Sequence, residues 1–186
     1  MKTMEFEIRR ANASDANDIA DAHLDSISSI GALFYPAETV KGWGAGLTGD
    51  LYVKAMERGE VFYIAVGAIH GKPVVMGFAS HRVEAQRHRT AVYVRGNAAR
   101  RGIGSALFRV AEAAAISAGA TSIHVDASLA AVEFYKANGF EVVGCGEHRL
   151  RSGHSMACAF MRKTLTATGP PASNNGLNPT AIQHEN

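Results

Sequence analysis

The stretch that decides the fold is VYVRGNAARRGIGSALF, residues 92–108. It begins with the end of a β-rich segment and runs into residues with helical spacing, so its glycines lie between a strand and a helix. Glycine lets the backbone approach a ligand closely. The first N–H groups of a helix have no intrahelical partner, and Arg100 and Arg101 add positive charge beside them. The stretch therefore predicts a site for a pyrophosphate.

Two other phosphate-binding motifs do not fit this stretch. A dinucleotide-binding fingerprint needs a third glycine where the chain has Leu107, followed by an acidic residue at a set distance. A P-loop needs Gly-Lys-Ser/Thr, which is absent. An ordinary tight turn stays open as the alternative.

Hydrophobic periodicity on both sides of the stretch predicts an ordered α/β domain over residues 1–165 with no internal repeat. The expected strands cover residues 5–10, 61–66, 74–79, 89–94, 123–127, 141–144 and 156–165. The expected helices cover residues 14–30, 37–43, 50–58, 105–117 and 130–138, the first of them capped by Ser14. Residues 166–186 hold three of the five prolines and no apolar periodicity, which predicts a flexible tail.

Composition narrows the class of protein. The chain has 186 residues, 47% of them hydrophobic, and a net charge of +2, as in ordinary globular proteins. It has no basic stripe of the kind that nucleic-acid-binding proteins carry, no apolar run long enough to cross a membrane, and no signal peptide at its start. We therefore expect a cytoplasmic protein without nucleic-acid or membrane partners.

The histidines and cysteines predict no metal site. The eight histidines show no metal-ligand spacing, and two cysteines are too few for a metal-binding framework. We expect Cys145 and Cys158 to be two free thiols, with a single bridge between them as the alternative.

Two motifs in the right order resemble those of the GNAT acetyltransferases. Residues 92–94 with 99–104 resemble motif A, and residues 128–135 with 138–140 resemble motif B. The resemblance covers residues 6–165. It implies an α/β fold with a mixed, mostly antiparallel sheet flanked by helices. The pyrophosphate turn would lie between the fourth strand and the third helix of the family's fold.

The resemblance also implies a set of cofactor-binding residues for acetyl-CoA. Backbone groups of Val92 and Val94 would pair with the pantetheine arm, and Ser128 stands where the family often has an asparagine that bonds it. Ala99 stands where the family usually has glutamine or arginine. The pyrophosphate would lie on the amides of Arg100, Arg101, Gly102, Ile103, Gly104 and Ser105.

The catalytic residues follow from the same resemblance. Tyr135 stands at the family's general-acid position; its alternative role is a tyrosine packed on the core. His88 stands where the histone acetyltransferase branch has a glutamate base, and it can equally be a solvated histidine at a strand end. Glu84 is the second candidate for the base, and Thr90 stands where a related subgroup has an acid.

The acceptor site is less constrained. Tyr35 and Trp43 either line it or pack the helices on the sheet. The function that we expect is transfer of an acetyl group from acetyl-CoA to a primary amine of a small molecule or peptide, by direct attack in a ternary complex. A homodimer stays open, and the alternative function is a GNAT-like protein that binds or senses acyl-CoA without turnover.

Overall fold

The computed structural model describes residues 5–69 and 71–165. Within them the chain forms seven strands and five α-helices, with short 3₁₀ turns between some of them. The strands are β1 Phe6–Arg10, β2 Val61–Ile69, β3 Lys72–Glu84, β4 Arg87–Val94, β5 Ser122–Ser128, β6 Glu141–Arg149 and β7 Ser155–Thr164. The helices are α1 Ala16–Ser29, α2 Ala37–Gly44, α3 Gly49–Glu57, α4 Ile103–Ser117 and α5 Val132–Ala137. The segment 166–186, for which the sequence predicts a tail, lies outside the described residues.

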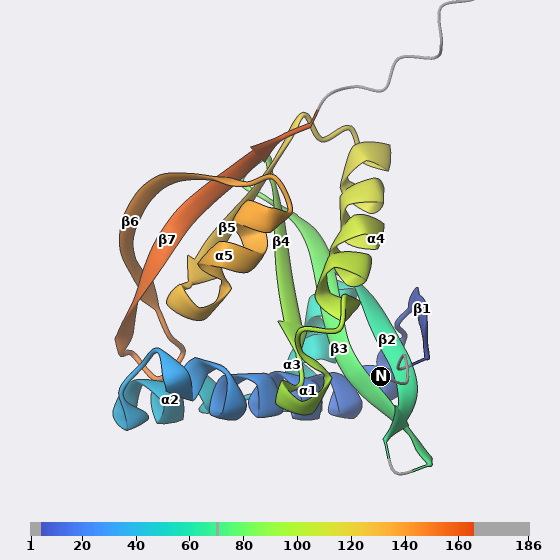
Figure 1. Cartoon of the computed structure of the whole chain (residues 1–186). Coiled ribbons are helices and arrows are strands. Elements are labelled where there is room, and N and C mark those ends of the chain that lie inside the picture. Colours follow the sequence, from blue (N-terminus) through green and yellow to red (C-terminus); the bar gives the residue numbers. More distant parts are fainter. Residues whose placement is uncertain (1–4, 70, 166–186) are drawn as a thin grey trace, which may run out of the picture.

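The strands of the described chain form one sheet in the order β1-β2-β3-β4-β5-β7-β6. The pairs are antiparallel except for β4 and β5, which run parallel. The helices flank this sheet (Figure 1). The mixed, mostly antiparallel α/β fold predicted from the sequence is therefore confirmed.

The two central strands separate soon after they meet. Their parallel ladder pairs His88 with Ile123 and Arg89 with His124. On its other edge, β5 pairs with β7 along its whole length, from Ser122 to Ser128. The sheet consequently opens between β4 and β5 beyond Arg89 (Figure 1).

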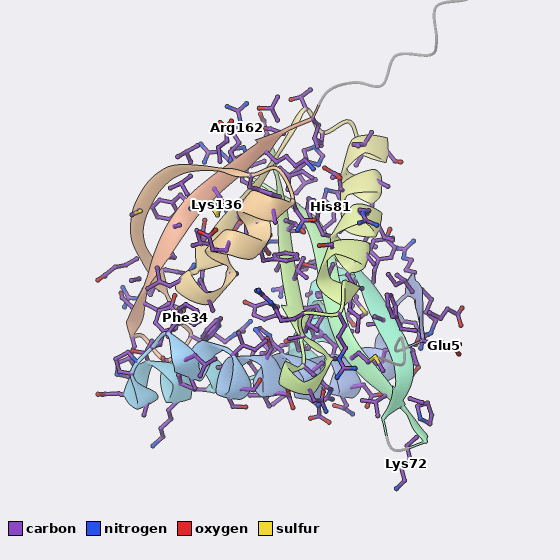
Figure 2. All side chains as sticks on the ribbon, viewed as in Figure 1. Glu5, Phe34, Lys72, His81, Lys136 and Arg162 are labelled. Carbon is purple, nitrogen blue, oxygen red and sulfur yellow. The ribbon has the colours of Figure 1, made fainter. Side chains whose placement is uncertain are left out.

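The helices form two layers, one on each face of the sheet. On one face, α1 and α3 cover a core that includes Ile19, Tyr52, Ile64 and Phe78. On the other face, α4 packs on β2, β3 and β4 through Ile103, Leu107 and Ala111, and Phe108 joins it to a cluster that contains α5 and β5 residues. Side chains fill the space between these layers and the sheet (Figure 2).

The structure corrects several predicted boundaries. β3 extends to Glu84 and β6 to Arg149, because backbone pairing continues past the apolar residues by which strands are recognised. The cap at the start of the first helical region is Asn12, not Ser14. Its side chain accepts from the Ser14 N–H, and Asp15 accepts from the Asn12 N–H, which makes a capping box.

The two cysteines are free thiols, as expected. In the antiparallel β6–β7 pair, Cys145 lies opposite Ala159, and Cys158 lies opposite Gly146. Adjacent register positions point to opposite faces of a sheet, so Cys145 is exposed while Cys158 is buried.

Candidate active site

The predicted anion-binding turn lies between β4 and α4. Gly102 precedes the helix with a φ of 81°, a left-handed conformation that favours glycine. The Ala106 N–H donates to the Gly102 carbonyl at 3.0 Å. The amides of Ile103, Gly104 and Ser105 come before this bond and have no partner within the helix. They are the donors that an anion would use.

The arginines near the turn have different roles. Arg100 and Arg101 are exposed and form no ion pair within residues 5–69 and 71–165. Arg95 instead donates from Nε to the Val75 carbonyl at 2.8 Å, and its Nη1 lies 3.7 Å from Asp25. Two of the three arginines can therefore meet a phosphate, and the third holds the strand end in place.

Motif A and motif B form one site. A Cβ added to Gly104 would lie 3.0 Å from Cε2 of Phe134, so glycine allows α5 to lie close to the start of α4. Asn138 donates from Nδ2 to the Phe134 carbonyl at 2.8 Å and to Oγ of Ser105 at 3.3 Å. The second motif thus supports the first turn of α4.

The hydroxyl of Tyr135 reaches the opening between β4 and β5. Tyr135 is 2% exposed, and its oxygen accepts from the Val92 N–H at 3.2 Å. Burial raises the pKa of this hydroxyl well above its usual range, which keeps it protonated. Because the oxygen accepts from Val92, its own hydrogen is free to be donated elsewhere.

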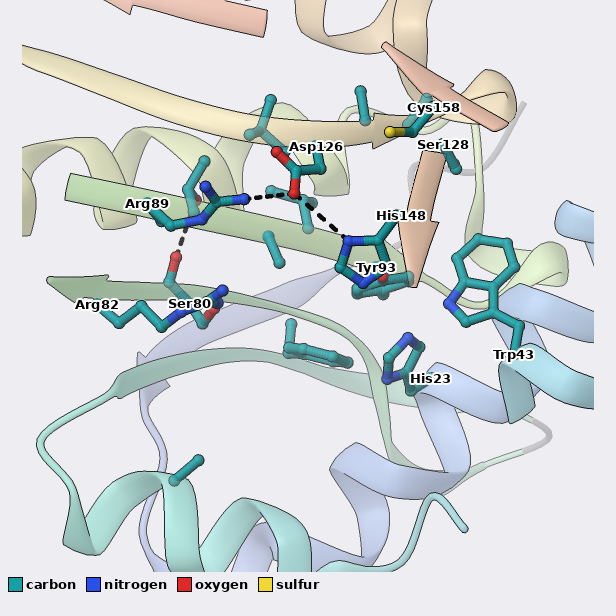
Figure 3. Close-up of a pocket in the computed structure, with 18 of the residues that line it drawn as sticks. His23, Trp43, Ser80, Arg82, Arg89, Tyr93, Asp126, Ser128, His148 and Cys158 are labelled. Atoms are coloured by element: carbon teal, nitrogen blue, oxygen red, sulfur yellow. Dashed lines mark hydrogen bonds and ion pairs between the residues drawn. The ribbon is translucent and has the colours of Figure 1, made fainter. Parts of the chain in front are cut away.

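A cavity of about 330 Å³ lies at this opening, lined by α1, α2, α3 and the central strands (Figure 3). Tyr135 and Ser128 are part of its wall. One part of the wall is aromatic: His23, Trp43, Tyr52, Phe62, Phe78 and Tyr93. Another part is charged or titratable: Glu60, Arg82, Arg89, Asp126, His148, Arg149 and Arg151.

A line of polar side chains runs along the cavity wall from β4 to β6. Nη2 of Arg89 lies 2.8 Å from Oδ2 of Asp126, and Nδ1 of His148 lies 3.4 Å from the same oxygen (Figure 3). Asp126 is largely buried, while His148 is half exposed. The carboxylate therefore orients the His148 ring and is itself held by an arginine.

His23 lies among the aromatic side chains. Its ring centroid is 3.7 Å from that of Tyr93, and its Nδ1 is 2.6 Å from the Tyr52 hydroxyl. Its Nε2 is buried and has no hydrogen-bond partner among the described residues. Burial, with a smaller effect from the charge of Arg151, lowers the pKa of His23 to about 3, so the ring is neutral near pH 7.

Comparisons with known proteins find similarity to acetyltransferases. A family model described as an acetyltransferase (GNAT) domain matches residues 57–142, which contain both motifs. A GCN5-related N-acetyltransferase from Rhodopseudomonas palustris is 26% identical, with a TM-score of 0.74 over 89% of this chain and 99% of that one. Residues 57–142 thus match a GNAT acetyltransferase domain, and the chain shares the fold of GNAT structures.

Other GNAT structures share the fold at lower identity. The PaiA N-acetyltransferase from Thermoplasma acidophilum, solved with coenzyme A, is 18% identical, with a TM-score of 0.68 over 87% of this chain and 100% of that one. A ribosomal-protein-alanine N-acetyltransferase from Brucella melitensis is 20% identical, with a TM-score of 0.62 over 86% of this chain and 99% of that one. No curated protein matches the chain.

The GNAT fold brings some predicted site residues together. Val92, Ser128 and Tyr135 line the cavity. Val94 lies beside the turn, with its Cγ2 3.5 Å from where a Cβ of Gly104 would be. Three of the predicted residues therefore line the cavity, and the fourth lies beside the turn 100–105.

His88, the first candidate for the base, does not line this cavity. Side chains alternate along a strand, so His88 shares the face of β4 on which Val92 and Val94 pack toward α4. Its Nδ1 lies 3.0 Å from Nε2 of His81, and the two rings stack with centroids 5.2 Å apart.

The other two positions considered for the base are also engaged elsewhere. Glu84 is exposed, lies outside the cavity wall, and pairs with Arg89 at 3.2 Å and Arg82 at 3.4 Å. Thr90 lines the cavity but is buried, and its hydroxyl donates to the Ser80 carbonyl at 2.8 Å.

Of the two aromatic residues expected at the acceptor site, only one lines the cavity. Trp43 lines the cavity. Tyr35 does not: its hydroxyl donates to the Ala157 carbonyl at 2.6 Å and accepts from the Leu129 N–H at 2.7 Å. Tyr35 therefore joins β7 to the segment after β5, and its ring packs against Trp43 with centroids 5.7 Å apart.

The sequence-based expectation missed Arg89, Asp126, His148, His23 and Arg151. One signal was available: alternation in β5 puts Asp126 and Ser128 on the face opposite the buried Ile123, Val125 and Ala127. His148 lies beyond the predicted end of its strand, and His23 comes from a distant helix. As a separate observation, the described helices include none that could cross a membrane.

Proposed function

We propose that the protein transfers an acetyl group from acetyl-CoA to a primary amine, of a small molecule or a peptide, by direct attack. The observation that carries this proposal is the opening between β4 and β5. Phe134 packs beside Gly104 of the anion-binding turn, and the next residue, Tyr135, lines the charged and aromatic cavity with its hydroxyl at the Val92 N–H. A donor on one side of the sheet and an acceptor on the other would meet at this hydroxyl.

The residues of the turn fit the pyrophosphate of acetyl-CoA. The amides of Ile103, Gly104 and Ser105 are free of helical bonds, and the exposed Arg100 and Arg101 supply two positive charges. A side chain at Gly104 would fill this space beside Phe134. Backbone groups of Val92 and Val94 and the side chain of Ser128 then hold the pantetheine in the opening.

Tyr135 acts as the general acid. The amine nitrogen forms a bond to the acetyl carbon, the bond between that carbon and sulfur then breaks, and a proton given to the thiolate of coenzyme A assists its departure. The Tyr135 hydroxyl keeps its hydrogen because burial raises its pKa, and the Val92 N–H fixes the position of its oxygen. It therefore offers that hydrogen to the sulfur.

His148 takes the place of His88 and Glu84 as our proposed base, because it lines the cavity and they do not. An amine must lose a proton as it attacks, and a neutral imidazole accepts protons near neutral pH. Asp126 orients this ring, as Arg89 orients Asp126. The other titratable or charged cavity residues on β4, β6, β7 and the hairpin after β6 are Tyr93, Arg149, Arg151 and Cys158.

Direct attack fits the surroundings of the one cysteine in the cavity wall. An acetyl-enzyme would need a thiolate nucleophile. Burial raises the pKa of the Cys158 thiol, with a further effect from Asp126, so the thiol form is favoured. The described residues of the wall include no other cysteine.

The proposal is tested by binding and turnover measured separately. Acetyl-CoA should raise the melting temperature, since a ligand bound only by the native state stabilises it, while NADH should not. Release of coenzyme A thiol should then depend on the addition of an amine. No shift at saturating acetyl-CoA would overturn the proposal; a shift without turnover of any amine in a broad panel would favour a sensor of acyl-CoA.

A further inference from the structure

The aromatic part of the cavity forms a chamber that we define by His23, Trp43, Tyr52, Phe78 and Tyr93. Burial raises the pKa of Tyr93 to about 12 and that of Tyr52 further, so both phenols remain neutral. The chamber therefore suits an apolar or aromatic body. Its five side chains include no carboxylate, and Glu60 of the cavity wall is paired with Arg82 at 3.6 Å.

The unpartnered nitrogen of His23 is a hydrogen-bond donor. If Nδ1 carried the hydrogen, the Tyr52 hydroxyl hydrogen and the Nε2 lone pair would both lack partners among the described residues. If Tyr52 instead donates to Nδ1, only the Nε2–H is unpartnered. The second arrangement leaves fewer buried polar groups unsatisfied, so Nε2 carries the hydrogen.

The arginines of the cavity wall are not equally neutralised. Arg89 pairs with Asp126 and Glu84, and Arg82 pairs with Glu84 and with Glu60 at 3.6 Å. The β6–β7 hairpin adds Arg149 and Arg151, which form no ion pair with any described residue.

The hairpin that carries these arginines is fixed in place. Leu150, between them, is buried with Tyr35 and Met156, and its N–H donates to the His154 carbonyl at 2.7 Å. Arg151 is also close enough for its charge to act on His23 and Tyr52. Arg151 is exposed and lines the same cavity as the chamber, so its guanidinium is available to a ligand bound there.

We propose that the acceptor amine carries a carboxylate on an apolar or aromatic body, and that His23 Nε2–H and Arg151 bind this carboxylate. The inference rests on the proposed function and specifies its acceptor. The unused polar groups of the chamber are donors, and a guanidinium matches the geometry of a carboxylate. The amine end would then lie toward His148 and Tyr135.

The test compares acceptors that differ only in the carboxylate. Suitable pairs are L-phenylalanine with 2-phenylethylamine, 4-(aminomethyl)benzoate with benzylamine, and 5-aminovalerate with butylamine. At least one acid should have a kcat/KM about tenfold or more above that of its partner, and Arg151→Gln should remove about ten- to a hundredfold of that value. The neutral amines and the KM for acetyl-CoA should change little.

A matched control uses an arginine outside the cavity. Arg162 is exposed near the end of β7 (Figure 2), and Arg162→Gln should leave the preference for acids unchanged. Faster turnover of the neutral member in every pair, or an equal loss on both members in Arg151→Gln, would overturn the inference and leave the proposed function standing.

A binding measurement covers the case in which no acceptor of the panel is turned over. Calorimetry with the protein saturated by coenzyme A should show N-acetyl-L-phenylalanine bound more tightly than N-acetyl-2-phenylethylamine, with the difference lost in Arg151→Gln. Equal affinities, or no binding of either compound, would overturn the inference. Failure of coenzyme A itself to bind would instead count against the proposed function.

Discussion

The two sides of the opening in the sheet are built differently. On the cofactor side, one continuous stretch of chain supplies backbone amides at the start of α4 and two exposed arginines. On the acceptor side, side chains from α1, α2, α3, the central strands and the β6–β7 hairpin meet around one cavity. The first site depends on backbone geometry and the second on tertiary packing.

This difference bears on what each site can tolerate. Backbone amides do not change with sequence, so any side chain that fits the turn preserves the anion site. The acceptor side depends on the identity of each side chain, because charge pairs such as Arg89–Asp126 fail when one partner is replaced. We expect substitutions on the two sides to affect binding and catalysis separately.

The largest effect should come from Gly104→Asp. A side chain there would fill the space beside Phe134, and its carboxylate would repel the pyrophosphate. We expect the affinity for acetyl-CoA, measured by calorimetry, to fall about a hundredfold or more. Circular dichroism should show an unchanged fold.

The matched control adds the same carboxylate farther along the helix. Ala113 is exposed in the middle of α4, so Ala113→Asp should keep the affinity for acetyl-CoA. If Gly104→Asp also kept it, the turn would be structural only.

The next largest effect should come from Tyr135→Phe. Loss of a general acid typically lowers a rate by about 10²–10⁴-fold, and the phenylalanine ring preserves the packing against Phe140. We expect kcat to fall in this range while Kd for acetyl-CoA changes little, measured by steady-state kinetics and calorimetry.

Tyr35→Phe is the control for the loss of a tyrosine hydroxyl. Tyr35 also bonds backbone groups but lies outside the cavity wall. This variant should lose stability, by about 1–3 kcal/mol for the groups left unpaired, and keep its kcat at a temperature where it is folded. Equal losses of kcat in both variants would mean that Tyr135 acts only through structure.

A smaller loss of rate should follow from His148→Gln. A rate that depends on a neutral imidazole falls in acid, and glutamine cannot accept the proton. We expect kcat/KM to fall by about a hundredfold and the acidic limb of the pH–rate profile to disappear.

His154→Gln gives the comparison within the same hairpin, because His154 is exposed and lies outside the cavity wall. It should leave both the rate and the acidic limb unchanged. If the limb persists in His148→Gln but is lost in His88→Gln or Glu84→Gln, the base is one of the two residues that the sequence first suggested.

The sequence predicted most of the fold because its signals are local. The glycine turn, the apolar β-rich run of β2 and the helical period of α4 each involve neighbouring residues. The polar ends of β3 and β6 were missed, since their pairing is visible only with their neighbours in place. Capping by Asn12 was missed because Ser14 offers the same chemistry two residues later.

The acceptor site was the least predictable part for the same physical reason. His23 lies more than a hundred residues of sequence before Asp126 and His148, and the three meet only through the sheet order. The resemblance placed the base on β4, where alternation turns His88 toward α4. Only the packing of the β6–β7 hairpin identifies His148 and Arg151 as members of the cavity.

The smallest effect that we predict concerns stability on the acceptor side. The pKa of His23 is lowered from 6.5 to about 3 in the folded protein, chiefly by burial. Below pH 6.5 the unfolded chain binds a proton that the folded chain does not, so folding stability falls as the pH drops from 6.5 toward 3. At pH 5 the loss from this one group is about 2 kcal/mol.

His23→Gln removes that titration without adding a charge. The variant loses the ring contact with Tyr93, so it should be less stable than the wild type at pH 8. Its free energy of unfolding, measured by urea denaturation, should nevertheless decline less between pH 8 and pH 5, by about 2 kcal/mol. His81 and His124, whose pKa values are also lowered by burial, keep part of the slope in both proteins. An identical slope in the two proteins would mean that His23 is protonated in the fold, and its Nδ1 could then no longer accept from Tyr52.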